Sequence, residues 1–511
     1  MPKHRNTVRQ TKFNKPVAKQ EAQQLKTSNK KDDDPQNSLL NKLMNIDQFF
    51  SIPTRAVIFN LTDYFLLLFA TIISLTTHLL KIGEPSSVVF DEVYFGNFTN
   101  FYHYGEYYFD IHPPLGKLLL YAGSLISGYK AKEVYSRIGA PLNPREIMKL
   151  RIWPALFGSL RSPILFVTLK FLNVSPQWCF TVALIISLDN ALLVESRLVL
   201  IEAFLSFFAC LTLLATSIII RKPEKRKVNI YLICVLAGLS AGATVSIKFT
   251  GSGVAVMLVF AIFINYPFIE AFKMSFICAI SGFFVFFIQF IIHFHLLPRR
   301  GDGCRFQPFY CAYLQYSPSL NQSTNARYES YQNQHKKRGI VYYIVDLIRV
   351  MLSSNFAIHV QHSYSSKWWQ WPLMCGKMTY LWVEQNKQLW CIGNPIVWYS
   401  GLIGIITWVI SSFFKFDVRV NLWVFFGYMI SYLPFSLIKR VMWNYHYFIP
   451  LLISLVAGAL AANSIRPRAI IVPSLICAAS FALYIVYFPL TYGTPLYYER
   501  FLKIVPKGWR Y

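Results

Sequence analysis

Charged residues are scarce in this chain of 511 residues. They make up 14% of it, while hydrophobic residues make up 54%; a typical soluble domain has about 25% charged residues. The mean hydropathy is +0.38. A surface this apolar excludes an ordinary soluble enzyme. The length leaves room for about ten or more membrane crossings, because each crossing needs about 20 apolar residues.

Acidic residues are also few, with 24 Asp and Glu against 50 Lys and Arg, which gives a formal net charge of +26. Such an excess can indicate nucleic-acid binding. Here the basic residues lie in short clusters between apolar runs and not in one folded basic domain. That distribution is typical of membrane topology signals, so we expect no nucleic-acid partner.

Cysteine is sparse as well, and nine Cys in a chain of this length exclude a dense disulfide scaffold. Residues 1–60 lack the charged, then apolar, then small-residue pattern of a cleaved signal peptide. We predict that they form a disordered, basic, cytoplasmic tail. The first apolar run would then act as an uncleaved signal anchor.

Apolar runs are the dominant feature of the remaining sequence, and they predict an all-α integral membrane protein, because a backbone in lipid must satisfy its hydrogen bonds internally. We expect about eleven transmembrane helices. The runs lie near residues 63–80, 152–172, 177–194, 198–220, 230–247, 251–266, 273–297, 395–414, 420–438, 446–463 and 469–488.

The charged loops predict which side each connection faces. The basic loops 221–227 and 466–468 would lie in the cytoplasm with the tail, as the positive-inside rule requires. The long polar connections 81–150 and 298–394 then face the opposite, lumenal side. Lys439-Arg440 and the basic C-terminus also fall on that side, against the rule.

This topology divides the chain into four parts. They are a tail (1–60), an N-terminal membrane module (61–297) that includes the first large loop, a second large lumenal loop (298–394), and a C-terminal module of four helices (395–511).

The second loop holds two features typical of a lumenal segment. Its four cysteines (Cys304, Cys311, Cys375 and Cys391) could form one or two disulfides in any of three connectivities, or remain free. The sequon at Asn321 is the one we expect to be glycosylated.

The first loop carries the strongest chemical signal. It contains Phe90-Asp91-Glu92 and then the segment from Phe109 to Lys117, which includes Asp110-Ile111-His112-Pro113-Pro114. Carboxylates beside a membrane are costly unless they are solvated, paired or functional. One of them could take a proton from an attacking hydroxyl. A solvated loop with a proline turn is the alternative.

The order of several motifs resembles the protein O-mannosyltransferases, which are dolichyl-phosphate-mannose-dependent enzymes of the multi-spanning C-type glycosyltransferase (GT-C) fold. The resemblance extends over residues 60–495. It rests on the two first-loop segments, Arg151-Ile152-Trp153-Pro154, Asp189 to Arg197, Gly238 to Gly251, His293 to Pro298, His362 to Leu373, Gly393-Asn394-Pro395, Leu433-Pro434-Phe435 and Tyr445-His446-Tyr447.

The sequence departs from the family pattern at several points. Eukaryotic members usually carry a lumenal β-trefoil (MIR) module, for which the interval 310–340 has no room. Glu202 stands where an aspartate is common, and Tyr94 and Tyr445 stand where histidine is often seen. The missing module puts the choice of acceptor in doubt.

The resemblance implies transfer of mannose from dolichyl phosphate mannose to Ser or Thr hydroxyls of secretory-pathway proteins, with inversion, at the endoplasmic reticulum membrane. It also implies a homodimer or a heterodimer with a paralogue. An inverting transfer needs one carboxylate base, and we assign this role to Asp91. Glu92 would hold the acceptor peptide or neighbouring helices, with a structural ion pair as the alternative.

Arg151 is the leading candidate for the cation that stabilises the departing lipid phosphate, with an interfacial anchor as the alternative. Other candidates have weaker support. Lys248 could reach the same phosphate or snorkel to headgroups. His362 and Lys367 could contact phosphate or sugar, or be polar loop residues. Trp368 and Trp371 could stack on sugar or peptide, or belong to an interfacial aromatic belt. Asp110 and His112 would fix the first loop against the membrane.

No metal-ligand spacing is evident, so we expect no cofactor and no transition metal, while a divalent cation at the phosphate stays possible. Three other functions remain open. The chain could be a GT-C transferase that acts on a glycolipid or glycan acceptor, a non-catalytic partner subunit of such an enzyme, or a transporter.

Overall fold

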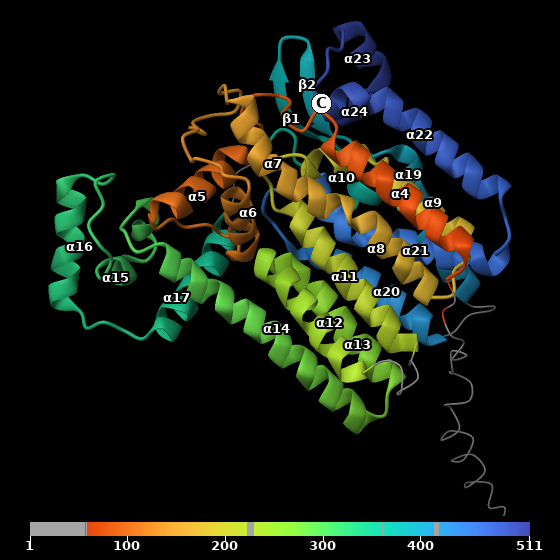
Figure 1. The fold of residues 1–511 in the computed structure, drawn as a ribbon, viewed down its shortest axis with the longest axis horizontal. Helices are drawn as coiled ribbons and strands as arrows, with labels where there is room; N and C mark the ends of the chain where they lie inside the picture. Colours follow the sequence, from red (N-terminus) through yellow and green to blue (C-terminus); the bar gives the residue numbers. More distant parts are fainter. Residues whose placement is uncertain (1–56, 58, 222–228, 359–361, 413–417, 511) are drawn as a thin grey trace, which may run out of the picture. The chain divides into compact units, whose positions relative to one another are not determined.

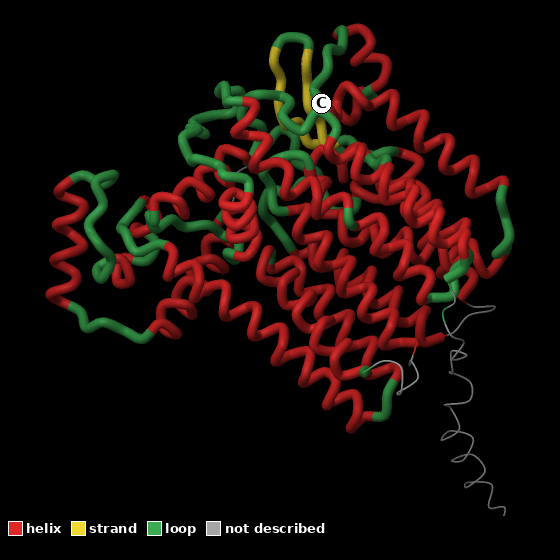
Figure 2. The backbone as a smooth tube through the Cα atoms, viewed as in Figure 1, coloured by secondary structure: helices red, strands yellow, loops and turns green. Residues whose placement is uncertain are grey.

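The computed structural model describes residues 57, 59–221, 229–358, 362–412 and 418–510. Nearly all of the predicted tail, 1–60, lies outside the described residues. The described part is built mainly of helices, with one two-stranded sheet (Figure 2). The fold class expected from the apolar runs is confirmed, apart from this sheet.

Every apolar run of the sequence is helical in the structure. The helices are α4 (Leu61–Leu79), α7 (Pro144–Ser159), α8 (Arg161–Phe171), α9 (Pro176–Ser187), α10 (Asn190–Ser196), α11 (Glu202–Arg221), α12 (Ile230–Ile247), α13 (Ser252–Asn265), α14 (Phe268–Leu296), α19 (Pro395–Ser412), α20 (Val418–Tyr432), α21 (Phe448–Ile465) and α22 (Ile471–Tyr492) (Figure 1).

The number of spans differs from the predicted eleven. Among the described residues, nine helices are long and apolar enough to cross a membrane, or ten if α9 and α10, which are bent by 57°, count as one span. The runs near 251–266 and 395–414 form shorter apolar helices. One of the nine is α17 (Ile340–Ala357), which lies inside the predicted second loop.

The segment from Gly238 to Gly251 brings two helices into close contact. A Cβ added to Gly242 of α12 would lie 2.5 Å from Cα of Gly282 in α14, and one added to Gly238 would lie 2.3 Å from the carbonyl oxygen of Cys278. Only glycine permits this backbone approach. The packing fixes the end of α12, where Lys248 follows directly.

The two predicted lumenal loops contain helices and strands of their own. The first has α5 (Glu92–Tyr104) and α6 (Leu115–Ile126). The second has η2 (Asp302–Arg305), α15 (Pro308–Cys311), α16 (Gln322–Gln334), α17, α18 (Gln370–Leu373), β1 (Thr379–Glu384) and β2 (Lys387–Cys391). Further along lie η3 (Leu433–Leu437), η4 (Asn444–Tyr447), α23 (Tyr498–Ile504) and α24 (Lys507–Arg510).

The antiparallel hairpin β1–β2 is the element that the all-α prediction missed. It supports η4, because the Asn444 side-chain amide donates to the Cys391 carbonyl (2.6 Å) and the Thr379 hydroxyl donates to the Asn444 side-chain oxygen (2.6 Å). The hairpin therefore fixes the backbone next to Tyr445 and His446.

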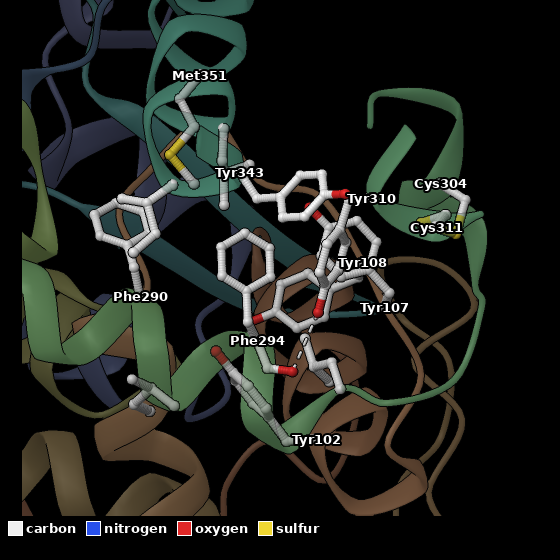
Figure 3. Close-up of a cluster of buried hydrophobic side chains, with 14 of the residues drawn as sticks. Tyr102, Tyr107, Tyr108, Phe290, Phe294, Cys304, Tyr310, Cys311, Tyr343 and Met351 are labelled. Atoms are coloured by element: carbon white, nitrogen blue, oxygen red, sulfur yellow. Dashed lines mark hydrogen bonds between the residues drawn. A yellow bond between two sulfur atoms is a disulfide. The ribbon is translucent and has the colours of Figure 1, made fainter. Parts of the chain in front are cut away.

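An aromatic cluster joins the two loops to the end of α14 (Figure 3). Tyr107 and Tyr108 of the first loop pack with Phe294 of α14 and with Tyr310, whose hydroxyl donates to the Phe294 carbonyl (3.3 Å). On its other side the cluster includes Tyr343 and Met351 of α17. Burying this much apolar area holds the first loop in place.

Beside the cluster, Cys304 and Cys311 form a disulfide, while Cys375 and Cys391 are free. One of the two bridges that the sequence allowed is therefore present.

Candidate active site

The first loop is strained where it leads into α5. Phe90 has a positive φ of 48°, which is unfavourable for a bulky residue and typical of functional sites. Its ring is held edge-on by Trp443 (centroids 5.8 Å apart) and Tyr445 (6.3 Å). Contacts with the C-terminal module thus set the position of the next residue, Asp91.

Asp91 is the N-cap of α5, but its side chain makes no capping hydrogen bond. An aspartate at this position normally accepts one from the helix, so the carboxylate stays available for other chemistry. Removal from water raises the pKa of Asp91 to about 7, and the negative charges of Glu202 and Asp110 add to this while Lys248 opposes it. A carboxyl group with a pKa near neutrality suits a general base.

Its neighbour Glu92 has an entirely different environment. Glu92 is fully buried and accepts four hydrogen bonds. Two come from Arg151 (Nε–Oε1 2.8 Å and Nη2–Oε2 2.7 Å), one from the Val89 amide (2.9 Å) and one from the Val199 amide (2.9 Å). The carboxylate is therefore saturated and ties the first loop to α7 and to the segment before α11.

Arg151 is held almost as completely. Besides Glu92, its guanidinium donates to the Pro85 carbonyl (2.7 Å) and the Ser87 carbonyl (3.1 Å), and its side chain is 0% exposed. The direct phosphate contact predicted for Arg151 does not fit this geometry, because the side chain is fully buried and four of its five N–H donors are used inside the protein. The alternative reading of Glu92, a structural ion pair, agrees with the structure.

Lys248 is a buried cation beside Glu202 and Tyr445. It forms an ion pair with Glu202, and its ammonium group is 5.4 Å from the Tyr445 ring centroid. Lys248, Glu202, Tyr445 and His446 line one cavity, together with residues of α11, η3 and α21. Glu202, which the sequence singled out only as a departure from the family pattern, is thus the ion-pair partner of Lys248.

The predicted role of Asp110 and His112 in fixing the first loop agrees with their contacts. Asp110 pairs with the buried Lys117, which also donates to the His112 carbonyl (2.6 Å). Burial lowers the pKa of His112 well below its usual value, and the charges of Lys248, Lys117 and Arg440 act in the same direction. His112 is therefore neutral and can hydrogen-bond a hydroxyl.

Arg440 is the residue that sequence reasoning missed. It lies within electrostatic range of His112, Tyr445 and His446, and in the described part of the chain it forms no ion pair. Its signal in the sequence was the violation of the positive-inside rule, since a cation on the lumenal side needs another reason to be there.

The tryptophan-rich segment contributes less than predicted. His362 packs edge-on against Trp443 (4.6 Å) and so reaches the site indirectly, whereas the exposed Lys367 has no side-chain contact with the site residues among the described interactions. Trp368 is half-buried against Tyr432 (5.4 Å).

Trp371 corrects a prediction. It is 2% exposed, stacks on His446 (6.0 Å) and donates to the Ser366 hydroxyl (2.9 Å). A buried ring cannot offer a stacking platform to sugar or peptide, so Trp371 supports His446.

Two expectations concern groups that are not seen. Among the described residues, no group of three or more His, Cys, Asp or Glu could hold a metal ion, and the expectation about metals stays a prediction. Asn321 is exposed as the N-cap of α16, so its glycosylation also stays a prediction.

With this geometry in view, the chain was compared with known proteins. The model of the family "dolichyl-phosphate-mannose-protein mannosyltransferase" matches residues 68–298, and the model of the C-terminal four-transmembrane region of protein O-mannosyltransferase matches residues 341–505. The chain belongs to the protein O-mannosyltransferase family. The interval between the two matches holds η2, α15 and α16.

Individual relatives of this family are more distant. The dolichyl-phosphate-mannose–protein mannosyltransferase 4 of Candida albicans is 30% identical over 253 residues, which is 46% of this chain and 34% of the relative. The protein O-mannosyl-transferase 1 of Rattus norvegicus is 32% identical over 185 residues, which is 35% of this chain and 25% of the relative. The matched region thus spans between a quarter and about a third of these relatives.

The fold has a close counterpart among solved structures. A chain of the Saccharomyces cerevisiae protein O-mannosyltransferase Pmt1-Pmt2 complex, bound to the sugar donor, superposes with a TM-score of 0.79 at 18% identity, over 89% of this chain and 93% of that chain. The GT-C fold expected for this family member is therefore confirmed.

The buried ion pair and the free carboxylate predict opposite responses to mutation. Arg151→Ala or Glu92→Gln leaves an uncompensated buried charge in this family member, which costs roughly 3–5 kcal/mol of folding free energy. Asp91→Asn removes no partner, so we expect stability within about 1 kcal/mol of wild type. Thermal unfolding of the purified full chain in detergent measures the difference.

Arg145→Ala is the matched control, because Arg145 is exposed on the same helix, α7, and its loss should leave the melting temperature unchanged. If Arg151→Ala unfolds at the wild-type temperature, the buried ion pair between Glu92 and Arg151 does not stabilise the fold, and this account of it is wrong.

Proposed function

We propose that this chain transfers mannose from dolichyl phosphate mannose to Ser or Thr hydroxyls of secretory-pathway proteins, at the lumenal side of the endoplasmic reticulum membrane. The observation that carries the proposal is the contrast between two adjacent carboxylates. Glu92 is saturated by Arg151, while Asp91 has no capping bond and a pKa raised to about 7. Environments that separate two acids in this way assign them different roles.

Asp91 acts as the base. It takes the proton from the acceptor hydroxyl as the hydroxyl oxygen attacks C1 of mannose. The bond from C1 to the phosphate oxygen breaks at the same time, which inverts the configuration at C1. No covalent glycosyl intermediate is formed, so no second carboxylate is required, and Glu92 is free to be structural.

The leaving dolichyl phosphate gains negative charge as the sugar departs, and fixed cations stabilise that charge. We assign this task to Lys248 and Arg440, in place of Arg151. Lys248 lines the cavity beside Asp91, and Arg440 is close to His112 and His446 and unpaired in the described part of the chain. The neutral imidazole of His112 would contact a sugar hydroxyl.

An apolar groove supports a lipid-linked donor. It is lined by Leu115 at the start of α6, by Phe208 to Ile218 of α11, by Ile233 to Ala243 of α12, and by Val285 of α14. Leu115 is three residues from His112, and Phe208 is six residues, about 9 Å, from Glu202 along α11. The groove therefore begins within about two helical turns of Glu202 and follows the helices from there, which suits a polyprenyl chain.

The acceptor and the partner rest on the family. Relatives are named as protein mannosyltransferases, and the structural counterpart is a complex of two different members. We accordingly propose Ser/Thr-containing acceptor proteins and a homodimer or paralogue heterodimer. Transfer to a glycolipid or glycan acceptor, or a non-catalytic supporting role, are the competing functions that the assay below distinguishes.

The assay follows labelled mannose from dolichyl phosphate mannose into a Ser/Thr-rich peptide, in microsomes from cells that express each variant at equal level. We expect Asp91→Asn to lower the rate by about 10²–10⁴-fold, the usual contribution of a general base. Arg440→Gln should lower it by up to about 10²-fold through weaker stabilisation of the leaving phosphate. Lys439→Gln, the exposed neighbour of Arg440, is the control and should retain wild-type activity.

Wild-type microsomes that transfer no mannose to peptide, even with a paralogue co-expressed, would contradict the proposal. Labelled glycolipid in that case would identify the alternative acceptor, and no product at all would identify a supporting subunit.

The rate of transfer should also depend on pH through Asp91. The base must be deprotonated, so a pKa of about 7 places the acidic limb of the profile near neutral pH, with activity falling as pH decreases. Glu202→Gln removes a charge that raises this pKa and should move the limb to lower pH. Lys248→Met removes a charge that lowers it and should move the limb to higher pH. Shifts in the same direction, or none, would exclude Asp91 as the titrating base.

A further inference from the structure

A second apolar groove lies away from the catalytic cavity, between α21 and α22. It is lined by residues of α9, α19, α21 and α22, and it has a volume of about 560 Å³. This volume lies within the range of common ligand pockets, about 300–1,000 Å³, so the groove can accept a hydrocarbon chain. Most of its lining residues are small or apolar, among them Gly458 and Ala462 on α21 and Ala479 on α22.

The N-terminal half of α22 is less buried than its C-terminal end, which leaves room for the groove. Near its C-terminus, Tyr484 and Tyr492 pack on Leu188 and Leu193, and the Tyr492 hydroxyl donates to the Thr77 carbonyl (2.7 Å). In its first nine residues, 471–479, only Pro473 is buried. Figure 1 shows α22 at one side of the helices, with its N-terminal half standing clear of them.

Two arginines mark the open end of this groove. Arg466 lines it directly, and Arg468 follows in the same five-residue connection, 466–470. Both residues are exposed, and in the described part of the chain neither guanidinium has an ion-pair or hydrogen-bond partner. The Trp178 indole donates to the Arg466 carbonyl (3.2 Å), which is the arrangement expected at a membrane interface.

We propose that this groove binds an anionic glycerophospholipid, with an acyl chain between α21 and α22 and the headgroup phosphate at Arg466 and Arg468. Arginine binds phosphate bidentately, and an apolar groove that ends in unpaired cations complements an anionic lipid in both parts. The basic connection is expected on the cytoplasmic side, where the leaflet carries anionic lipids.

The ligand is not the sugar donor. His446, which lines the catalytic cavity, precedes α21, and Arg466 follows its last residue. The two residues are separated mainly by α21, whose 18 residues correspond to about 27 Å of helix. A donor whose phosphate lies beside Asp91 cannot place that phosphate at Arg466, so this lipid site is separate from the transfer reaction.

Native mass spectrometry of the purified full chain, titrated with phosphatidylserine or phosphatidylcholine of identical acyl chains, tests the site. We expect preferential binding of phosphatidylserine. The double variant Arg466→Gln/Arg468→Gln should weaken phosphatidylserine binding by about 30-fold, because each basic residue contributes about a fivefold factor at a lipid surface, and it should leave phosphatidylcholine binding unchanged.

Two further variants complete the test. Ala462→Phe/Ala479→Phe fills the groove and should reduce binding of both lipids, with the melting temperature confirming that the chain is folded. Lys132→Gln, an exposed cation of the first loop, is the charge control and should have no effect. Equal binding of the two lipids would overturn the proposal. It would also be overturned if filling the groove converted a dimer to a monomer and left lipid binding unchanged, because the groove would then hold a second protein chain.

Discussion

Glu92 and Arg151 bury one negative and one positive charge against each other with neither side chain exposed, and the geometry of the site depends on this pair. Charges removed from water are tolerated only when nearly every donor and acceptor is used. Here they are, through the Pro85 and Ser87 carbonyls and the Val89 and Val199 amides. One ion pair thereby joins the first loop, α7 and the segment before α11.

This arrangement explains why two adjacent carboxylates behave differently. At the start of α5, Glu92 is buried and paired with Arg151. The Asp91 carboxylate makes no capping hydrogen bond and lies within electrostatic range of Glu202 and Lys248. The strained Phe90 packs against Trp443 and Tyr445, and these contacts restrict the backbone of the loop next to Asp91. The N-terminal module thus carries the proposed base, Asp91, and residues of the C-terminal module contact the loop that holds it.

Hydropathy located most of the long helices, because every apolar run that was identified in the sequence is helical in the structure. It failed for α17, whose apolar run is interrupted by Asp346 and Arg349 and was assigned to the second loop. It also failed for β1–β2, since a short hairpin has no long-range signal. Gly238 and Gly242 were noticed as a motif, but only the structure shows that they permit contact between α12 and α14.

The sequence singled out most residues of the candidate site, but it did not show how they pair with one another. Residue type suggested Arg151 as the phosphate cation, because arginine suits phosphate. The sequence does not show that Arg151 forms an ion pair with Glu92, because the two residues are 59 positions apart and meet only in the folded structure. Trp371 was misread for the same reason, since burial cannot be read from an aromatic motif. Arg440 was visible only as an exception to a charge rule.

The most direct test of this account is to replace the ion pair by a neutral pair of similar size, Glu92→Gln together with Arg151→Met, and to measure both unfolding and mannose transfer. Each single change strands a buried charge, whereas the double change strands none. The account predicts that the double variant is more stable than either single variant and regains measurable transfer. A double variant that is folded but inactive, at the level of Asp91→Asn, would contradict it, because Glu92 or Arg151 would then take part in the chemistry.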